Sequence, residues 1–273
     1  MAEYIKFVDV TKCTGCRACM VACKNWNDLP AEPEEFRGTY QSNQNVTAYT
    51  WNNLTFTENE NSNGNFDWLF RHSTCFHCTI AGCELACPED AISHTEFGSV
   101  VIDADKCVGC GYCVQGCYFD VIQLATYKDK NGREYRKAQK CHLCTNRLEN
   151  GFEPACVTAC PTDAITYGEK NDLLRQAEER LKVVKERYPN ANIYNPQGID
   201  GTVTVYLLAD KPSVYGLPEN PKAKLSQVVW KDYAQPLGKL AVGATTIGVL
   251  GAIITNGALA LKNRVKEGED HHE

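Results

Sequence analysis

Cysteine is the residue type in this chain most able to do chemistry, because its thiolate binds metals. The chain has 16 cysteines, which fall into four groups of four with none left over. The first and third groups share the spacing C-x2-C-x2-C-x3-C: Cys13, Cys16, Cys19 and Cys23, then Cys107, Cys110, Cys113 and Cys117. The second group has four residues in its middle gap and the fourth has eleven: Cys75, Cys78, Cys83 and Cys87, then Cys141, Cys144, Cys156 and Cys160.

This spacing suits a cube of iron and sulfur atoms. Two residues between cysteines let one tight loop present three thiolates to three irons of a 4Fe–4S cluster. The x3-C step then places the fourth sulfur on the following helical turn, where it faces away. In two-cluster ferredoxins that fourth cysteine ligates the other cluster. We therefore predict that Cys117 serves a neighbouring cluster, although the spacing does not choose the partner group.

Two other uses of the cysteines are less consistent with the pattern. Eight disulfides would need pairs three residues apart in tight loops, which is poor disulfide geometry, and the N-terminal MAEYIKFVDV does not read as a secretory signal. Zinc ribbons use paired C-x2-C units, so the fourth group alone would pass for one, but the triple pattern does not. The net charge of −6 without a long basic stripe indicates no nucleic-acid partner.

The elements that carry the cysteines are repeated within the chain. FVDVTKCTGCRACMVAC (7–23) aligns with VIDADKCVGCGYCVQGC (101–117), 94 residues further along. CELACPEDAI (83–92) aligns with CVTACPTDAI (156–165), 73 residues further along. Such repetition predicts copies of one supersecondary unit, here a strand, a cysteine loop and a short helix.

Outside the repeats, three stretches predict further elements. Alternation in VTAYTW (46–51) and LTFTE (54–58) predicts short strands, with a turn near Asn63-Gly64. DLLRQAEERLKVVKERY (172–188) predicts an amphipathic helix that starts near Asn171 and ends before Pro189. VTVYLLA (203–209) predicts a strand.

The apolar stretch LAVGATTIGVLGAIITNGALAL (240–261) contains no charge over 22 residues. As a helix it reaches about 33 Å, which is enough to cross a hydrocarbon core of about 30 Å. A buried soluble helix is the alternative.

Beyond the cysteines, four stretches carry a resemblance: VDVTKCTGCRACMVACKNWNDLPAE (8–32), STCFHCTIAGCELACP (73–88), KCVGCGYCVQGC (106–117) and KCHLCTNRLENGFEPACVTACPTDAI (140–165). With VYLLADKPSVYGLPENP (205–221), they resemble the iron–sulfur (beta) subunits of membrane-bound formate dehydrogenases. These belong to the four-cluster ferredoxin-like subunits of the DMSO-reductase (molybdopterin oxidoreductase) family.

The resemblance implies an α+β fold with two bacterial-ferredoxin-like units, insertions and one C-terminal transmembrane helix. Unit A comprises residues 1–23 and 141–228 and holds clusters 1 and 4. Residues 24–72 form an insertion, and unit B (73–140) holds clusters 2 and 3. The transmembrane helix spans 236–262, and a polar tail spans 263–273.

The family pairs its first motif with its fourth and its second with its third. The resemblance therefore implies four 4Fe–4S clusters with these ligands: Cys13, Cys16, Cys19 and Cys160 for cluster 1; Cys75, Cys78, Cys83 and Cys117 for cluster 2; Cys107, Cys110, Cys113 and Cys87 for cluster 3; Cys141, Cys144, Cys156 and Cys23 for cluster 4. All sixteen ligands to iron are cysteine. Cluster 1 would lie nearest the catalytic centre, followed by 4, 3 and 2.

The function that follows is electron transfer, with no catalytic residue in this chain. Its partners would be a molybdopterin-type catalytic subunit, an integral membrane subunit and membrane lipid. A hydrogenase or another respiratory reductase is the alternative source of electrons, since the module is reused. The resemblance places the cluster-bearing body on the extracytoplasmic face, exported with a partner that carries a twin-arginine signal.

Five residues near the cysteines need separate expectations. Tyr118 stands where the family usually has proline, and its ring would cover cluster 2. We expect a surface or core tyrosine that the site tolerates, and the alternative hypothesis is a changed potential of that cluster. His77 and His142 are expected to donate hydrogen bonds within their loops, because each cube already has four thiolates. Lys140 and Arg147 are expected to be solvated charges or local counter-ions.

Overall fold

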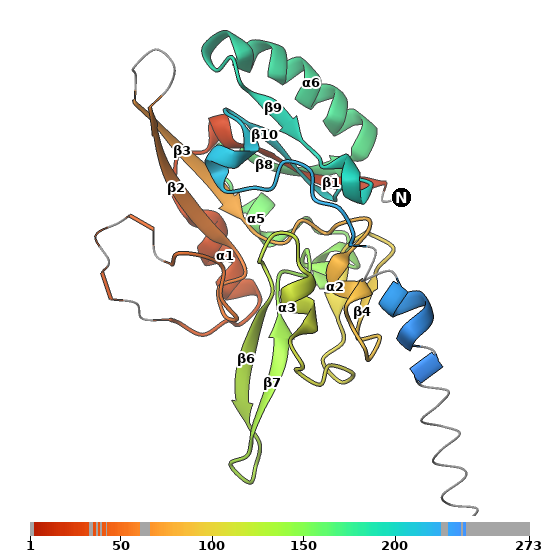
Figure 1. Cartoon of the computed structure of the whole chain (residues 1–273). Coiled ribbons are helices and arrows are strands. Elements are labelled where there is room, and N and C mark those ends of the chain that lie inside the picture. Colours follow the sequence, from red (N-terminus) through yellow and green to blue (C-terminus); the bar gives the residue numbers. More distant parts are fainter. Residues whose placement is uncertain are drawn as a thin grey trace, which may run out of the picture. The chain divides into compact units, whose positions relative to one another are not determined.

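The computed structural model describes residues 3–32, 35–36, 38, 40–41, 43–60, 66–224, 229–235 and 237–238 (Figure 1). Residues 1–227 form one compact unit, and residues 228–273 form a second one. In the second unit the structure describes a short π-helix, Trp230–Ala234. The first unit contains every cysteine of the chain.

A four-stranded sheet in the order β8-β1-β10-β9 organises the first unit. Its strands are β1 (Tyr4–Asp9), β8 (Ile165–Glu169), β9 (Asn192–Tyr194) and β10 (Thr204–Leu208). β1 runs parallel to β10 and antiparallel to β8, and β9 is antiparallel to β10. All five residues of β10 are buried, as expected for a strand covered on both faces. The predicted strand at 203–209 is confirmed as β10.

Helix α6 (Lys170–Arg187) covers one face of this sheet (Figure 1). Ile5 and Phe7 of β1 pack with Leu173, Ala177 and Val184 of α6, which follow helical spacing. The predicted amphipathic helix is therefore confirmed. It begins one residue before the predicted start, because the side chain of its N-cap residue, Glu169, accepts hydrogen bonds from the first turn.

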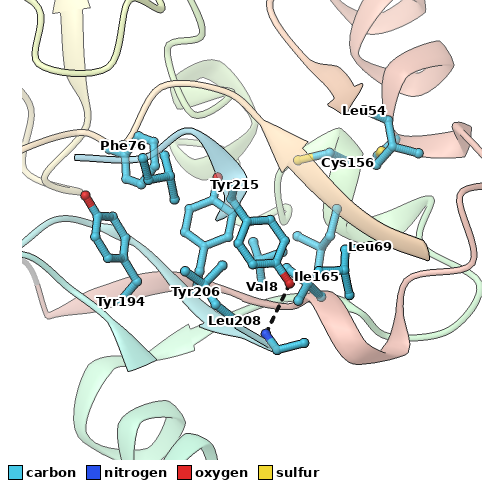
Figure 2. Close-up of a cluster of buried hydrophobic side chains, with 14 of the residues drawn as sticks. Val8, Leu54, Leu69, Phe76, Cys156, Ile165, Tyr194, Tyr206, Leu208 and Tyr215 are labelled. Carbon is cyan, nitrogen blue, oxygen red and sulfur yellow. Dashed lines mark hydrogen bonds between the residues drawn. The ribbon is translucent and has the colours of Figure 1, made fainter. Parts of the chain in front are cut away.

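The other face of the sheet carries a core of aromatic and aliphatic side chains. Figure 2 shows the rings of Tyr194, Tyr206 and Tyr215 beside Val8 and Ile165. Cys156 belongs to the same cluster. This face is therefore the one that meets the cysteine loops, while the opposite face meets α6.

The sequence repeats fold into equivalent hairpins. In one copy β1 pairs with β8, and in the other β5 (Val100–Ile102) pairs with β4 (Ile92–His94). The pair Val8–Ile165 in the first hairpin corresponds to the pair Ile102–Ile92 in the second, which are the positions that the two sequence alignments equate. The predicted strand and helix around each cysteine loop are confirmed.

The cysteine loops are followed by short helices. These are α1 (Ala18–Trp26), α2 (Gly82–Leu85), α3 (Tyr112–Gly116), α4 (Thr145–Leu148) and α5 (Ala155–Thr158). The short helix η1 (Val10–Lys12) precedes the first loop. The remaining elements are two hairpins, β2 (Asn53–Glu60) with β3 (Phe66–Ser73) and β6 (Gln123–Lys128) with β7 (Glu134–Gln139), and the short helices η2 (Gln197–Ile199) and η3 (Pro212–Tyr215).

The insertion differs from its prediction in one respect. LTFTE lies within β2 as expected, but VTAYTW, whose residues are all described, contains no strand. Thr47 accepts hydrogen bonds from the backbone N–H groups of Tyr49 and Thr50, and the Trp51 indole donates to the Ala48 carbonyl. These local bonds hold the backbone in turns and compete with strand pairing.

Three predicted features lie outside the described residues: the turn near Asn63-Gly64, the tail 263–273, and the membrane helix 236–262 except for 237–238. In the portion of the chain that is described, no helix is both long and apolar enough to cross a membrane.

Candidate iron–sulfur sites

The backbones of the first and third cysteine loops have the same geometry at equivalent positions. Gly15 and Gly109 both lie in the left-handed region, with φ of 72° and 70°. Arg17 and Gly111 are the left-handed residues that precede α1 and α3. A side chain at Gly109 would also meet the carbonyl oxygen of Arg136. The chain therefore turns sharply within each loop and places the last two cysteines on or beside a helix.

Three cavities are each lined by four cysteines. We call them site 1, lined by Cys13, Cys16, Cys19 and Cys160; site 3, lined by Cys107, Cys110, Cys113 and Cys87; and site 4, lined by Cys141, Cys144, Cys156 and Cys23. In each cavity three cysteines come from one sequence group and one comes from another. Within the described residues, no three His, Cys, Asp or Glu side chains are close enough to share a single metal ion.

A fourth set of cysteines, which we call site 2, is identified by its electrostatic contacts. Burial raises the pKa of the Cys78 thiol well above its usual value, and the neighbouring thiols of Cys75, Cys83 and Cys117 raise it further. Site 2 therefore also takes three cysteines from one group and one from another.

N–H groups point at sulfur in sites 3 and 4. The donor–sulfur distances are 3.7 Å from Asn27 Nδ2 to Cys23, 3.4 Å from Ala91 N to Cys87, 3.5 Å from Ala138 N to Cys107 and 3.3 Å from Leu143 N to Cys141. A neutral thiol is a weak acceptor, whereas a charged sulfur favours such donors. The donor pattern therefore fits thiolates bound to a metal cluster.

Burial works against the charged form of the bare thiols. It raises the pKa of Cys19, Cys113 and Cys144 to about 12 in each case. A metal that binds such a thiol deprotonates it. The four sites consequently combine thiols that are neutral by themselves with an environment that accepts them as metal ligands, and the residues present fit 4Fe–4S clusters.

The four sites lie in a definite order. Cys141 of site 4 packs beside Cys75 and Cys117 of site 2. Cys83 of site 2 lies within electrostatic reach of Cys113 of site 3, and these two share one packed cluster. Site 1 adjoins site 4, since, after burial, Cys156 contributes to the raised pKa of Cys19. The contacts therefore run 1, 4, 2, 3.

Solvent exposure distinguishes the ends of this series from its middle. The exposed cysteines are Cys16 of site 1 and Cys110 of site 3. The cysteines of sites 2 and 4 are buried or half-buried. Sites 1 and 3 therefore lie nearest the surface.

Two buried polar residues next to the sites were missed by the sequence analysis. Lys6 is fully buried, lines site 4 and has no hydrogen-bond partner for its Nζ among the described residues. His72 is 2% exposed, lines both site 1 and site 4, and has both ring nitrogens unpaired. Burial, Lys6 and Arg71 hold the pKa of His72 well below its usual range, so its ring is neutral.

The sequence signal for Lys6 lies in its strand. Residues 5–8 read Ile-Lys-Phe-Val, so strand alternation puts Lys6 on the same face as Val8. That face is the one that meets the cysteine loops. A lysine at an inward position of a buried strand is the observation that would have identified it.

Of the two expectations for Lys140, the solvated charge was wrong and the local counter-ion remains. It is 4% exposed, and its ammonium donates to the carbonyl oxygens of Val100 and Cys141. Arg147, by contrast, is half-buried and lies over the Trp26 ring, with its Cζ 4.4 Å from the ring centroid.

The two loop histidines make the hydrogen bonds that fix their rings. His142 accepts from the Thr145 N–H at Nδ1 and donates from Nε2 to Asn27 Oδ1 at 2.8 Å, as expected. His77 instead accepts, at Nδ1, from the N–H of Val100 at 3.0 Å. Burial lowers the pKa of both imidazoles, with Lys140 contributing.

Tyr118 lies against site 2. Its Oη is buried without a hydrogen-bond partner among the described residues. Burial, followed by Cys78 and Cys83, raises its pKa to about 12, so the hydroxyl keeps its proton.

Comparisons with known proteins match both halves of this arrangement. Residues 12–91 and residues 66–170 each match a family described as a 4Fe-4S dicluster domain. Together the two matches contain every cysteine of the chain.

The similar whole proteins come from several bacteria. The nitrate-inducible formate dehydrogenase iron–sulfur subunit of Escherichia coli is 40% identical over 277 residues, covering 100% of this chain and 91% of that protein. The formate dehydrogenase iron–sulfur subunit of Haemophilus influenzae is 39% identical, covering 99% and 85%. The formate dehydrogenase-O iron–sulfur subunit of Escherichia coli is 41% identical over 248 residues, covering 89% and 80%.

Proposed function

The chain belongs to the iron–sulfur subunits of formate dehydrogenases, and we propose that it carries electrons from a formate-oxidising molybdopterin subunit to an integral membrane subunit. It binds 4Fe–4S clusters and transfers electrons as part of a complex, without being catalytic alone. The observation that carries the proposal is the set of four-cysteine sites, which account for all sixteen cysteines. When bound, such clusters supply one-electron chemistry, and the protein tunes their potentials by hydrogen bonds, charge and exposure.

The ligand sets that we propose are those of sites 1 to 4, with one cysteine exchanged between each pair of sequence groups. Cys160 would complete site 1 and Cys23 site 4, while Cys117 would complete site 2 and Cys87 site 3. The shared cavities support these sets. We propose the domain organisation that the sequence predicts. Unit A (1–23 and 141–228) would hold sites 1 and 4, and unit B (73–140) would hold sites 2 and 3.

The contacts between the sites change the expected sequence of transfer. The predicted order 1, 4, 3, 2 requires site 4 to adjoin site 3, but Cys141 of site 4 packs beside Cys75 of site 2. We therefore propose the order 1, 4, 2, 3. The exposed cysteines at sites 1 and 3 support electron entry and exit at these two ends, with the catalytic subunit docked near site 1 and the membrane subunit near site 3.

Membrane attachment and location belong to the same proposal. The apolar segment 240–261 would span the membrane, in contact with lipid and with the membrane subunit. The cluster-bearing body would lie on the extracytoplasmic face after export with a partner.

The exchange of ligands gives the sharpest test. In the complex purified without oxygen, the double variant Cys16→Ser/Cys160→Ser should disturb one cluster, because both residues belong to site 1. The matched double variant Cys156→Ser/Cys160→Ser should disturb two, because Cys156 belongs to site 4. Iron content and low-temperature electron paramagnetic resonance (EPR) spectra count the intact clusters.

The opposite pattern, with Cys156→Ser/Cys160→Ser disturbing one cluster and Cys16→Ser/Cys160→Ser disturbing two, would refute the exchange. Dye reduction by the wild-type complex tests the electron source. Turnover with formate and none with hydrogen supports a formate-oxidising partner, and turnover with hydrogen alone would assign the subunit to a hydrogenase.

A further inference from the structure

A buried cation faces the cysteines of site 4. Lys6 lies on β1, fully buried, with its Nζ unpaired among the described residues. It lines the site 4 cavity and lies within electrostatic reach of all four of the site's cysteines: Cys141 and Cys156, which act on Lys6, and Cys23 and Cys144, on which Lys6 acts. Cys75 of the adjoining site 2 is the next nearest sulfur that acts on it.

An ammonium in this position needs an anionic partner. Removing a charge from water without a partner costs several kcal/mol, so buried charges are normally paired. Among the described residues, no carboxylate lines the site 4 cavity: besides Lys6 and the four cysteines, its polar side chains are the neutral ones of Asn27, Asn52, His72, Thr74 and His142. The phenol of Tyr206, which also acts on Lys6, donates to the His72 carbonyl. The anionic sulfurs of a cluster bound at site 4 are the partner that the chain can offer.

The internal repeat shows that the fold itself does not require lysine here. The position equivalent to Lys6 is Val100, which pairs with His94 as Lys6 pairs with Tyr167. Val100 is 1% exposed, so an aliphatic side chain fills the same place in the second hairpin.

Beside the second hairpin the buried cation is Lys140, which does not belong to the hairpin itself. The ammonium of Lys140 binds the Val100 carbonyl and lies within electrostatic reach of Cys78 and Cys83 of site 2. The buried lysines of the described chain are Lys6 and Lys140, and they face the two middle sites of the series. Unlike Lys140, Lys6 has no carbonyl that accepts from it in the part of the chain that the structure describes.

Resting on the proposed function, we propose that Lys6 is the protonated counter-ion of site 4, where its ammonium donates to the cluster's sulfurs and raises the site's reduction potential. One electron enters site 4 and the same electron leaves it, and Lys6 keeps its proton through both steps. A positive charge beside the site stabilises its reduced, more negative state more than its oxidised state. Lys6 is thus a positioning residue for electron transfer.

The test is a redox titration of the whole complex, followed by EPR under conditions that resolve the clusters. Lys6→Met removes the charge and keeps the length of the side chain. We expect the equilibrium constant for reduction of one cluster to fall at least tenfold, which is 59 mV for a one-electron couple, with the other clusters and the iron content unchanged. Lys6→Arg keeps the charge and should keep the potential. Lys182→Met removes the same charge from the exposed side of α6 and is the matched control.

Potentials that stay unchanged in Lys6→Met at full iron content would overturn the proposal. If Lys6→Met loses iron, Lys6→Gln and Lys6→Arg decide. Loss of one cluster in both neutral variants, with retention in Lys6→Arg, shows that the site needs the charge. Equal loss in all three variants shows that Lys6 acts only through packing and refutes the counter-ion role. The proposed function is judged separately, because it fails if the wild-type complex itself lacks 4Fe–4S clusters.

Discussion

The hydroxyl group of Tyr118 is buried beside site 2 without a hydrogen-bond partner in the described chain. Its pKa of about 12 keeps it a donor, and the sulfurs of Cys78 and Cys83 lie within electrostatic reach of it. Tyr118→Phe should therefore lower the affinity of site 2 for an electron by about 0.5–1.5 kcal/mol, roughly two- to tenfold in the equilibrium constant for reduction. A redox titration of the complex measures this change.

Tyr112→Phe is the matched control for Tyr118→Phe, because Tyr112 is 54% exposed and its hydroxyl reaches solvent. A Tyr118→Phe variant with the same four potentials as the wild type would show that this tyrosine only fills space. Tyr118→Pro, which restores the residue usual in the family, should shift the potential in the same direction.

The three cysteines that each group gives to its own site could be read from the sequence because the geometry of a cube sets their spacing, whereas the fourth ligand of each site was implied by the resemblance. Lys6 and His72 could not, because their burial arises from residues distant in the chain. Lys6 lies between β8 and β10 in the sheet, and no local pattern says that both neighbours will cover it. Lys140 was misjudged for the same reason, since Val100 lies 40 residues away.

At the scale of elements, α2 and α3 approach each other through two glycines. A side chain on Gly116 would lie 2.6 Å from the Gly82 carbonyl oxygen and 2.8 Å from Ala86 Cβ. Gly116→Ala should therefore push the two helices apart and destabilise the protein by about 1–3 kcal/mol, as overpacking does. Thermal unfolding without oxygen, with iron release as the readout, measures the loss.

Gly168→Ala is the control for this substitution, since its nearest contact is Leu173 Cδ1 at an ordinary 3.4 Å. The prediction fails if Gly116→Ala unfolds at the same temperature as Gly168→Ala. The equivalent positions beside the other hairpin are Ala22 and Ala155, so only the α2–α3 pair has glycine at both positions.

Elements with a strong periodic pattern were predicted well. The helix α6 follows from the spacing of Leu173, Ala177 and Val184, and the strand β10 from its continuous apolar run. The strand prediction for VTAYTW failed because side-chain hydrogen bonds hold this segment in local turns. The Thr47 hydroxyl donates to Glu32 and accepts from the N–H of Thr50. Side-chain hydrogen bonds of this kind leave no mark on hydrophobic periodicity.

At the scale of the whole molecule, the four sites form a series whose ends are exposed and whose middle is buried. The exposed cysteines of sites 1 and 3 leave those ends accessible to partner proteins, whereas sites 2 and 4 are covered and carry the two buried lysines. The repeat explains this arrangement: two hairpins of the same register each hold one outer and one inner site. A sequence alignment alone predicts the two copies but not which sites adjoin.

We propose that the apolar segment 240–261 attaches this series to a membrane, and this can be tested on the chain itself. We expect the full chain, expressed without its partners, to resist extraction from membranes by carbonate, and a chain ending at residue 235 to remain soluble with its clusters. A charge at the centre of a spanning segment costs about 2.5–3.5 kcal/mol, so Leu250→Lys should behave like the truncation.

Deletion of the charged tail 263–273 is the control and should leave the chain in the membrane, because its attachment depends on the apolar run. Extraction of the full chain together with the truncated one would contradict a membrane span, and docking to a membrane subunit would then be the sole means of attachment.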